Sequence, residues 1–229
     1  MPGTLYVVAT PIGNLEDITQ RALRILREVD LIACEDTRRT RILLAHHGID
    51  TPTTSYHEHN QRVRGPELVR RLLDGRSVAL VTDAGTPGIS DPGFRLVRQA
   101  RAAGVPVVPV PGPSAVVAVL SAAGVPADRF VFEGFLPPKP GRRINRLREL
   151  AALEMTLVFY ESPHRILATL EAVAQVFGDR EVVLAREVTK QFEEIVAAPA
   201  AAHHARLTAA GVRGEFTLVI PGRPVPAAG

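Results

Sequence analysis

The stretch LVTDAGTPGISDPG, residues 80–93, joins the end of an apolar run to a loop rich in glycine and proline. The run covers residues 78–81, and five glycine or proline residues fall within the nine positions 85–93. This density excludes a helix or a central strand. We expect a rigid loop at the carboxyl end of a buried strand, which is where open α/β sheets bind ligands. Its side chains include two carboxylates and two hydroxyls suited to a small polar molecule: Asp83, Asp91, Thr86 and Ser90.

Strand and helix patterns alternate around this loop through the first half of the chain. Apolar strands are predicted at residues 5–9, 31–35, 53–55, 77–83 and 105–112. Helices are predicted between them at residues 15–30, 37–48, 65–75 (beginning just after Pro66) and 92–104. Strands separated by helices of this length imply parallel βαβ units. The fold class predicted for this half is therefore α/β, with a parallel, doubly wound sheet.

The pattern changes after Gly112. Helices are predicted at residues 113–124, 141–154 and 164–178, and strands at 130–137, 155–161, 180–189 and 214–222, with an alanine-rich segment before the last strand. Because fewer of these strands are separated by single helices, the second half is predicted to be an α/β domain with a mixed sheet. We expect an N-terminal domain of residues 1–113 and a C-terminal domain of residues 114–229, with a cleft between them.

The composition is typical of a soluble globular protein, with 46% hydrophobic and 22% charged residues and a net charge of +3. No long apolar span or signal-peptide pattern is visible, so we expect no membrane association and a cytoplasmic location. The single cysteine, Cys34, excludes an internal disulfide and a cysteine-rich zinc site. Neither G-x-G-x-x-G nor G-x-x-x-x-G-K-[ST] occurs, so a nicotinamide Rossmann site and a P-loop are not supported.

Two further turns share the composition of the first loop and also follow predicted strands. They are TPIGN, residues 10–14, and PGPSA, residues 111–115. If the sheet is parallel, the three turns meet at one edge, because the carboxyl ends of parallel strands lie on the same side. We therefore expect them to form one ligand site.

Eight blocks of this sequence are similar, in order, to those of one enzyme family. They are LYVVATPIGNLEDIT, ACEDTRRT, LVTDAGTPGISDPG, PGPSA, FEGFLP, FYESPHRI, REVTKQFEE and GEFTLVI, spanning Leu5 to Ile220. The chain resembles the tetrapyrrole methylase superfamily and, within it, the bacterial enzymes that methylate a cytidine 2′-oxygen in the 16S rRNA of the 30S subunit. The resemblance implies the two-domain fold of that superfamily, S-adenosyl-L-methionine as methyl donor, and a homodimer. Longer members carry a further segment, whereas this sequence ends nine residues after Ile220, and we expect this to affect RNA binding rather than cofactor binding.

The resemblance also implies which residues bind the cofactor. Those of the N-terminal loops and the following turn are Ile12, Asp83, Thr86, Pro87, Ile89, Ser114 and Ala115, and those of the second domain are Tyr160 and Thr217. The cofactor carries a sulfonium, an ammonium, a ribose diol and a carboxylate. Carboxylates and carbonyls suit its cations and hydroxyls, and backbone N–H groups suit its carboxylate. We expect Asp83 to be an acceptor for the cofactor rather than a catalytic acid.

Clusters of basic residues are candidates for contacts with RNA phosphates. Residues 139–148 hold five basic side chains and no acid, which indicates a mobile basic loop entering a helix, or alternatively a solvated helix face. The arginines of residues 35–41 could also bind phosphates. The alternative for this segment is that Asp36 or Thr37 caps a helix whose arginines lie on a solvated face. The motif SYHEHN places two histidines on one side of an extended strand, where a substrate or dimer contact is favoured over a metal site. The predicted RNA-binding residues are Arg38, Arg39, His57, His59, Lys139, Arg142 and Arg143.

The expected reaction is in-line attack of a ribose 2′-hydroxyl on the sulfonium methyl carbon. Positioning supplies up to about 7–11 kcal/mol, whereas a general base supplies about 10²–10⁴-fold, or roughly 3–5 kcal/mol. Positioning is therefore expected to dominate, and no metal is expected. The candidate bases are Asp36, Glu187 and Lys190, and for Lys190 an ion-paired surface is the alternative.

Two other functions remain open at this stage. The first is a methyltransferase of the same superfamily that acts on a tetrapyrrole or a diphthine precursor, since arginines also bind tetrapyrrole carboxylates. The blocks EDTRRT, SYHEHN and ESPHRI favour the RNA enzyme. The second is a non-catalytic RNA-binding assembly factor, which the low aromatic content of 5% disfavours because such proteins stack bases on aromatic side chains.

Overall fold

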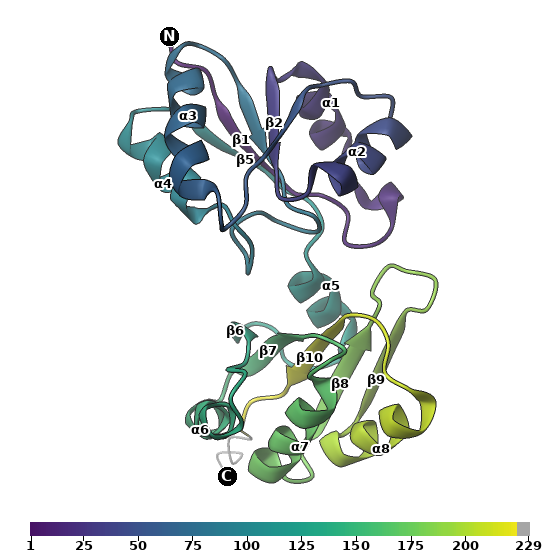
Figure 1. Cartoon of the computed structure of the whole chain (residues 1–229). Coiled ribbons are helices and arrows are strands. Elements are labelled where there is room, and N and C mark those ends of the chain that lie inside the picture. Colours follow the sequence, from purple (N-terminus) through teal and green to yellow (C-terminus); the bar gives the residue numbers. More distant parts are fainter. Residues whose placement is uncertain (224–229) are drawn as a thin grey trace. The chain divides into compact units, whose positions relative to one another are not determined.

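The computed structural model describes residues 1–223, and the chain divides into two compact units, Met1–Ser114 and Ala115–Gly229 (Figure 1). The sequence pattern had suggested a division after residue 113. Each unit has its own five-stranded sheet and its own hydrophobic core. No helix among residues 1–223 is long and apolar enough to cross a membrane.

The first unit contains a parallel sheet with the strand order β3-β2-β4-β1-β5. Its strands are β1 (Leu5–Val8), β2 (Leu31–Cys34), β3 (Thr53–Ser55), β4 (Val78–Leu80) and β5 (Val107–Val110). Its helices are η1 (Leu15–Asp17), α1 (Gln20–Glu28), α2 (Thr37–His46), α3 (Gln61–Leu73) and α4 (Phe94–Ala102). The predicted parallel, doubly wound sheet is confirmed.

Helices cover both faces of this sheet, with α1 and α2 on one side and α3 and α4 on the other (Figure 1). The central strand β4 is apolar throughout because both of its faces are buried. Ala79 packs in the cluster that includes α1 and α2, whereas Val78 and Leu80 pack in the cluster that includes α3 and α4. Since successive side chains of a strand point to opposite faces, a strand covered on both sides must be apolar throughout.

Capping side chains determine where the first two α-helices begin. Thr19 accepts a hydrogen bond from Ala22 N at 3.1 Å, so α1 begins at Gln20, after η1, and not at residue 15 as predicted. Asp36 accepts from Arg38 N at 2.8 Å and caps α2, as the capping alternative proposed.

The prediction that α3 begins just after Pro66 is wrong. The helix begins at Gln61, and Pro66 lies inside it. A proline at this position removes the hydrogen bond to the carbonyl of Arg62. Both Pro66 and Arg62 are exposed, so water can reach this side of the helix.

The prediction that His57 and His59 lie along an extended strand is also wrong. Asn60 Oδ1 accepts from His57 N at 2.9 Å, and Asn60 Nδ2 donates to Ser55 O at 3.2 Å. These hydrogen bonds reverse the chain directly after β3. The two histidines therefore lie in a turn, with their ring centroids 6.0 Å apart.

The second unit contains a mixed sheet with the order β6-β7-β10-β8-β9, in which β6 and β7 are parallel and the other pairs are antiparallel. Its strands are β6 (Phe130–Phe135), β7 (Thr156–Glu161), β8 (Glu181–Arg186), β9 (Glu194–Pro199) and β10 (Phe216–Ile220). Its helices are α5 (Ala115–Ala122), α6 (Pro140–Ala151), α7 (Ile166–Phe177) and α8 (Ala200–Ala210). The predicted mixed sheet is confirmed.

Helices cover both faces of this sheet as well. In β10, Leu218 packs in the cluster that contains residues of α6, α7 and α8, whereas Val219 packs in the cluster that contains residues of α5. The alanine-rich segment contains β9 and α8, which its pattern did not reveal. Alanine has a high helix propensity and a low strand propensity. The strand β9 therefore forms because it pairs with β8, which its own sequence does not predict.

Candidate functional site

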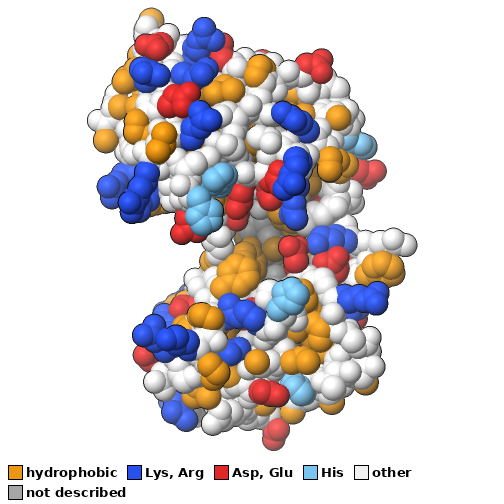
Figure 2. Space-filling model, viewed as in Figure 1, with side chains coloured by type: hydrophobic (Ala, Val, Ile, Leu, Met, Phe, Trp, Pro, Cys, Tyr) orange, Lys and Arg blue, Asp and Glu red, His pale blue; other side chains and the backbone are white. Residues whose placement is uncertain are grey.

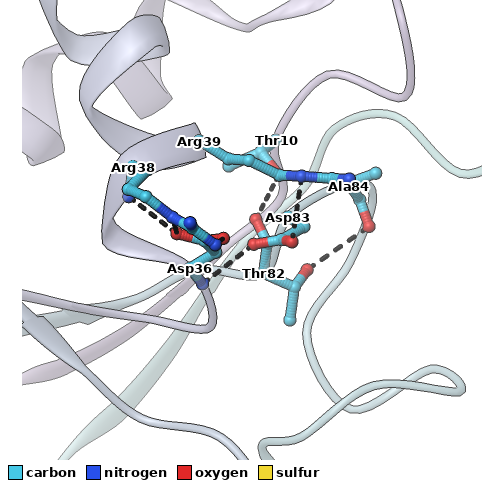
Figure 3. Close-up of polar contacts among 7 residues, drawn as sticks. All are labelled: Thr10, Asp36, Arg38, Arg39, Thr82, Asp83 and Ala84. Carbon is cyan, nitrogen blue, oxygen red and sulfur yellow. Dashed lines mark hydrogen bonds and ion pairs between the residues drawn. The ribbon is translucent and has the colours of Figure 1, made fainter.

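The turns after β1, β4 and β5 lie together at the carboxyl edge of the first sheet, as predicted. Thr10 and Gly85 form a two-way backbone bridge with N···O distances of 2.9 and 3.0 Å. Thr10 Oγ1 also donates to Thr82 O at 3.1 Å (Figure 3). On the other side, Thr86 Oγ1 donates to Pro113 O at 3.3 Å. The three turns are thus joined by hydrogen bonds.

Glycine is required at two points of the loop after β4. Gly85 has a φ of +79°, and a Cβ there would lie 3.6 Å from Ile12 Cγ2 and 3.9 Å from Pro113 O. Gly93 has a φ of +156°, and a Cβ there would lie only 3.1 Å from Gly88 N. The loop therefore folds back on itself and packs closely against both neighbouring turns, which gives a rigid frame for a ligand.

Acidic side chains connect the ends of β2 and β4 at the same edge (Figure 3). Asp83 Oδ1 accepts from Asp36 N at 3.0 Å, and Arg39 Nε lies 3.5 Å from Asp83 Oδ2. The carboxylate of Asp36 in turn accepts from Arg38 Nη2 at 2.7 Å. The hydrogen bonds from Arg38 lower the pKa of Asp36 to about 2, so Asp36 is a weak base at neutral pH.

A pocket of about 480 Å³ lies next to this acidic group and is lined by Glu35, Glu58 and Asp91 among others. Burial, together with the neighbouring carboxylate of Glu35, raises the pKa of Asp91 to about 6. Burial and the charge of Asp83 raise the pKa of Glu35. Sequence reasoning named Asp91 as a loop carboxylate but missed the pocket. Glu35 directly follows the strand β2, so the sequence does place it at this sheet edge, where it lines the pocket.

The other two candidate bases, Glu187 and Lys190, form ion pairs in the second unit. Lys190 Nζ lies 2.9 Å from both Glu187 Oε1 and Glu215 Oε2, and Glu187 Oε1 also accepts from Glu215 N. Burial opposes both charges, but these hydrogen bonds outweigh it, so the pKa of Glu187 is lowered and that of Lys190 is raised. Both side chains therefore remain charged at neutral pH, which fits the alternative of an ion-paired segment.

The two predicted cofactor residues of the second unit are neighbours in its sheet. Tyr160 in β7 and Thr217 in β10 are paired in register. The Tyr160 ring makes edge contacts with Phe132 and Phe135, at centroid distances of 4.9 and 5.9 Å. Thr217 is buried, with 5% of its surface exposed.

The remaining predicted cofactor residues lie in or beside the joined turns. Ile89 belongs to the loop after β4 and is 45% exposed, which is unusual for a large apolar side chain. Pro87 precedes it in the same loop. Ser114 ends the first unit, and Ala115 begins α5.

The prediction that Arg143 binds RNA does not fit its position. Arg143 is only 4% exposed, and it donates to Thr169 Oγ1 at 3.0 Å and to Pro138 O at 3.4 Å. Thr169 Oγ1 donates in turn to the buried carboxylate of Glu161 at 2.7 Å. Arg143 therefore holds the segment before α6 against α7. The predicted basic loop at residues 139–148 is instead helical, because α6 already begins at Pro140.

The other predicted phosphate contacts are accessible. Lys139 and Arg142 are exposed at the start of α6, and Arg38 and Arg39 are exposed at the start of α2. Figure 2 shows Lys and Arg side chains spread over the face drawn, with carboxylates among them. Among residues 1–223, no group of three or more His, Cys, Asp or Glu side chains is arranged to hold a metal ion.

The family model described as Tetrapyrrole (Corrin/Porphyrin) Methylases matches residues 4–203. Among curated proteins, the Ribosomal RNA small subunit methyltransferase I of Pseudomonas aeruginosa is 54% identical over 227 residues, which is 98% of this chain and 80% of the relative. The protein of the same name from Pasteurella multocida is 52% identical over 226 residues, 97% of this chain and 80% of the relative.

Solved structures with low sequence identity share the fold. A cobalt precorrin-4 methyltransferase has a TM-score of 0.73 at 19% identity, covering 95% of this chain and 94% of its own. A diphthine synthase has a TM-score of 0.72 at 16% identity, covering 96% and 90%. At these identities the likeness concerns the fold alone.

Proposed function

Since the chain belongs to the tetrapyrrole methylase family and is a methyltransferase of the ribosomal RNA small subunit methyltransferase I group, we propose that it methylates a cytidine 2′-oxygen in 16S rRNA. The observation that carries the proposal is the identity above 50% over nearly the whole chain with relatives named for small-subunit rRNA. The blocks EDTRRT and ESPHRI also favour an RNA substrate over a tetrapyrrole. A homodimer and a cytoplasmic location are parts of the same proposal, and sedimentation velocity tests the dimer.

We propose S-adenosyl-L-methionine as the methyl donor, and the residues of the joined turns fit it. Asp83 uses one oxygen for Asp36 N, and its other oxygen faces only the longer contact from Arg39, so it retains acceptor capacity for a cation or hydroxyl. The exposed apolar side chain of Ile89 can cover an apolar part of a ligand. Gly85 supplies the positive φ of +79° that the loop needs where it joins the turn after β1. The bound cofactor supplies an activated methyl group.

The proposed cofactor residues comprise a set in the first unit, a set at the unit boundary and a set in the second unit. They are Ile12, Asp83, Thr86, Pro87 and Ile89; Ser114 and Ala115; and Tyr160 and Thr217. Thr86 donates its hydroxyl proton to Pro113 O, so its hydroxyl oxygen is left to accept a hydrogen bond from a ligand. Alanine or valine variants test each set separately, by calorimetric titration with S-adenosyl-L-methionine.

We propose that positioning of the ribose hydroxyl, rather than a strong protein base, accounts for most of the rate. Positioning is worth about 7–11 kcal/mol, and base assistance roughly 3–5 kcal/mol. The pKa of Asp36 is lowered to about 2, and that of Glu187 is also lowered. The pKa of Lys190 is raised, so none of the three candidates changes its charge near neutral pH. Single-turnover rates of Asp36→Asn, Glu187→Gln and Lys190→Met near those of the unchanged protein would support this.

The deciding experiment measures methyl transfer from labelled S-adenosyl-L-methionine to 30S subunits and, separately, to naked 16S rRNA. Nuclease mapping of the product then locates the methylated nucleotide and shows whether the label sits on a ribose or a base. Label on a cytidine ribose supports the proposal. Binding of the cofactor without transfer to either substrate would contradict the proposed acceptor, and absence of binding would contradict the cofactor.

A further inference from the structure

The pocket of about 480 Å³ occupies one half of the carboxyl edge of the first sheet. Glu35 follows β2, Glu58 follows β3, and Gly88 and residues 90–95 follow β4. These three strands are neighbours in the order β3-β2-β4. The turns proposed to bind the methyl donor follow β4, β1 and β5, on the other half. The loop after β4 is shared, because its first half joins those turns and its second half lines the pocket.

The wall of the pocket includes an exposed aromatic ring. Phe94, the first residue of α4, is 66% exposed, although a phenylalanine is usually buried. The guanidinium of Arg98 lies 5.8 Å from the centroid of its ring, and Arg95 also lines the pocket. An accessible aromatic ring with arginines beside it is the kind of surface on which proteins stack an unpaired nucleobase. The volume falls within the usual range of about 300–1,000 Å³ for small-ligand sites.

The charges of the pocket select among ligands. Three carboxylates line it, from Glu35, Glu58 and Asp91, against the single guanidinium of Arg95. Such a site disfavours a phosphate and favours a group with N–H donors. Burial and nearby carboxylates raise the pKa of both Asp91 and Glu35, although His57 and Arg39 partly offset the rise at Glu35.

We propose that this pocket binds the base of the acceptor nucleotide, stacked on Phe94, with Glu35 and Asp91 accepting hydrogen bonds from the amino group of a cytosine-type base. Cytosine presents an N4 amino donor, whereas uracil presents an O4 acceptor that a carboxylate repels. Enzymes that act on a base turn it out of its stack into a pocket, and an unpaired base can enter such a pocket in the same way. The shared loop then brings the ribose of that nucleotide beside the proposed donor site. The proposal rests on the proposed RNA methylation.

The test compares Phe94→Ala, Phe94→Tyr, Glu35→Gln and Asp91→Asn with the unchanged protein on 30S subunits and on the preferred RNA substrate. We expect Phe94→Ala to raise the KM for RNA about tenfold and Phe94→Tyr to restore it, because a tyrosine ring also stacks. Changing the target cytidine to uridine lowers kcat/KM, and Glu35→Gln and Asp91→Asn reduce this discrimination about tenfold, because an amide can donate to O4. The dissociation constant for S-adenosyl-L-methionine stays within about twofold in all four variants. The matched control is Glu67→Gln, a carboxylate of α3 that does not line the pocket.

The two proposals fail differently. If the unchanged protein transfers no methyl group to the RNA, the proposed function is wrong. If it does, but Phe94→Ala keeps its KM and both carboxylate variants keep the full preference for cytidine, the pocket does not bind the base. A parallel rise in the dissociation constant for the cofactor would also overturn the assignment, because it would place the pocket in the donor site. Melting temperatures of each variant exclude loss of folding as the cause.

Discussion

The side chain of Asp83 accepts a hydrogen bond from the backbone N–H of Asp36 at 3.0 Å (Figure 3). This contact spans 47 residues of sequence and ties the loop after β4 to the first turn of α2. Asp36 in turn caps α2 with its own carboxylate. The loop predicted to bind the cofactor is therefore held in place by the segment predicted to contact RNA.

This arrangement predicts different outcomes for two substitutions of Asp83. Asp83→Asn keeps a side-chain oxygen for Asp36 N, so the free energy of unfolding should change by less than about 0.5 kcal/mol. Asp83→Ala removes the acceptor from a half-buried N–H and should cost about 1–2 kcal/mol. Because both remove the negative charge, both should weaken binding of S-adenosyl-L-methionine, by roughly tenfold. Urea unfolding and calorimetric titration measure the two effects, and full affinity in Asp83→Asn would exclude Asp83 as a charged cofactor ligand.

The neighbours Arg142 and Arg143 should behave in opposite ways when each is changed to alanine. Arg143 donates to the buried hydroxyl of Thr169 and to Pro138 O, so its loss leaves both oxygens without this donor. Leaving a buried polar group without its hydrogen-bond partner costs about 1–3 kcal/mol. Arg142 is exposed at the start of α6, and its loss should cost less than about 0.5 kcal/mol. Urea unfolding measures both, and equal stability losses would contradict the structural role of Arg143.

The exposed basic residues at the start of α6 should affect RNA binding rather than stability. Each phosphate contact contributes about 0.7–0.9 to the slope of log affinity against log salt concentration. Lys139→Gln and Arg142→Gln should each reduce the slope by about that amount if the exposed start of α6 touches the phosphates. Glu149→Gln on the same helix, which removes a negative charge, serves as a control for unspecific charge effects. A slope unchanged in Lys139→Gln, Arg142→Gln and the double variant would show that this segment does not contact RNA.

The strand ends and their turns could be predicted because glycine and proline exclude most other conformations, as at Gly85 and Pro87. The joining of the turns followed from the parallel order of the strands. The spacing of Arg143 in the sequence does predict that it is buried. It lies four residues before Leu147 and seven before Leu150, on the buried stripe of α6. Its partner Thr169, 26 residues away, could not be inferred from local pattern.

The turn after β3 and the pocket were less predictable, since both depend on contacts between segments distant in sequence. The pattern of SYHEHN predicts an extended strand, but the hydrogen bond from Asn60 Nδ2 to Ser55 O turns the chain. The pocket requires Glu35, Glu58 and Asp91 to meet, and they follow three different strands. The order β3-β2-β4 places them side by side, and the order of neighbouring strands is not encoded in any one of the motifs.

The raised pKa of Asp91 makes a prediction about stability and pH. Its folded-state pKa is about 6 against an ordinary value of 3.8, so between pH 4 and 6 the folded protein holds a proton that the unfolded chain has lost. The free energy of unfolding should therefore fall as the pH rises through this range, because the side chain of Asp91 must ionise in a partly buried site. The full linkage corresponds to about 3 kcal/mol, which solvent screening of this partly exposed group reduces to roughly 1–2 kcal/mol.

Asp91→Asn should consequently be more stable than the unchanged protein at pH 7.5 and equally stable at pH 4, as measured by urea unfolding. Glu67→Gln provides a comparison of opposite sign. The hydrogen bond from Arg64 lowers the pKa of Glu67, so its contribution to stability is present above its ordinary pKa of 4.5 and is lost as the pH falls below that value. Glu67→Gln should therefore be less stable than the unchanged protein at pH 7.5, and the difference should shrink at pH 4. If Asp91→Asn differs in stability from the unchanged protein by the same amount at both pH values, the pKa of Asp91 is not raised, and its carboxyl is less buried than proposed.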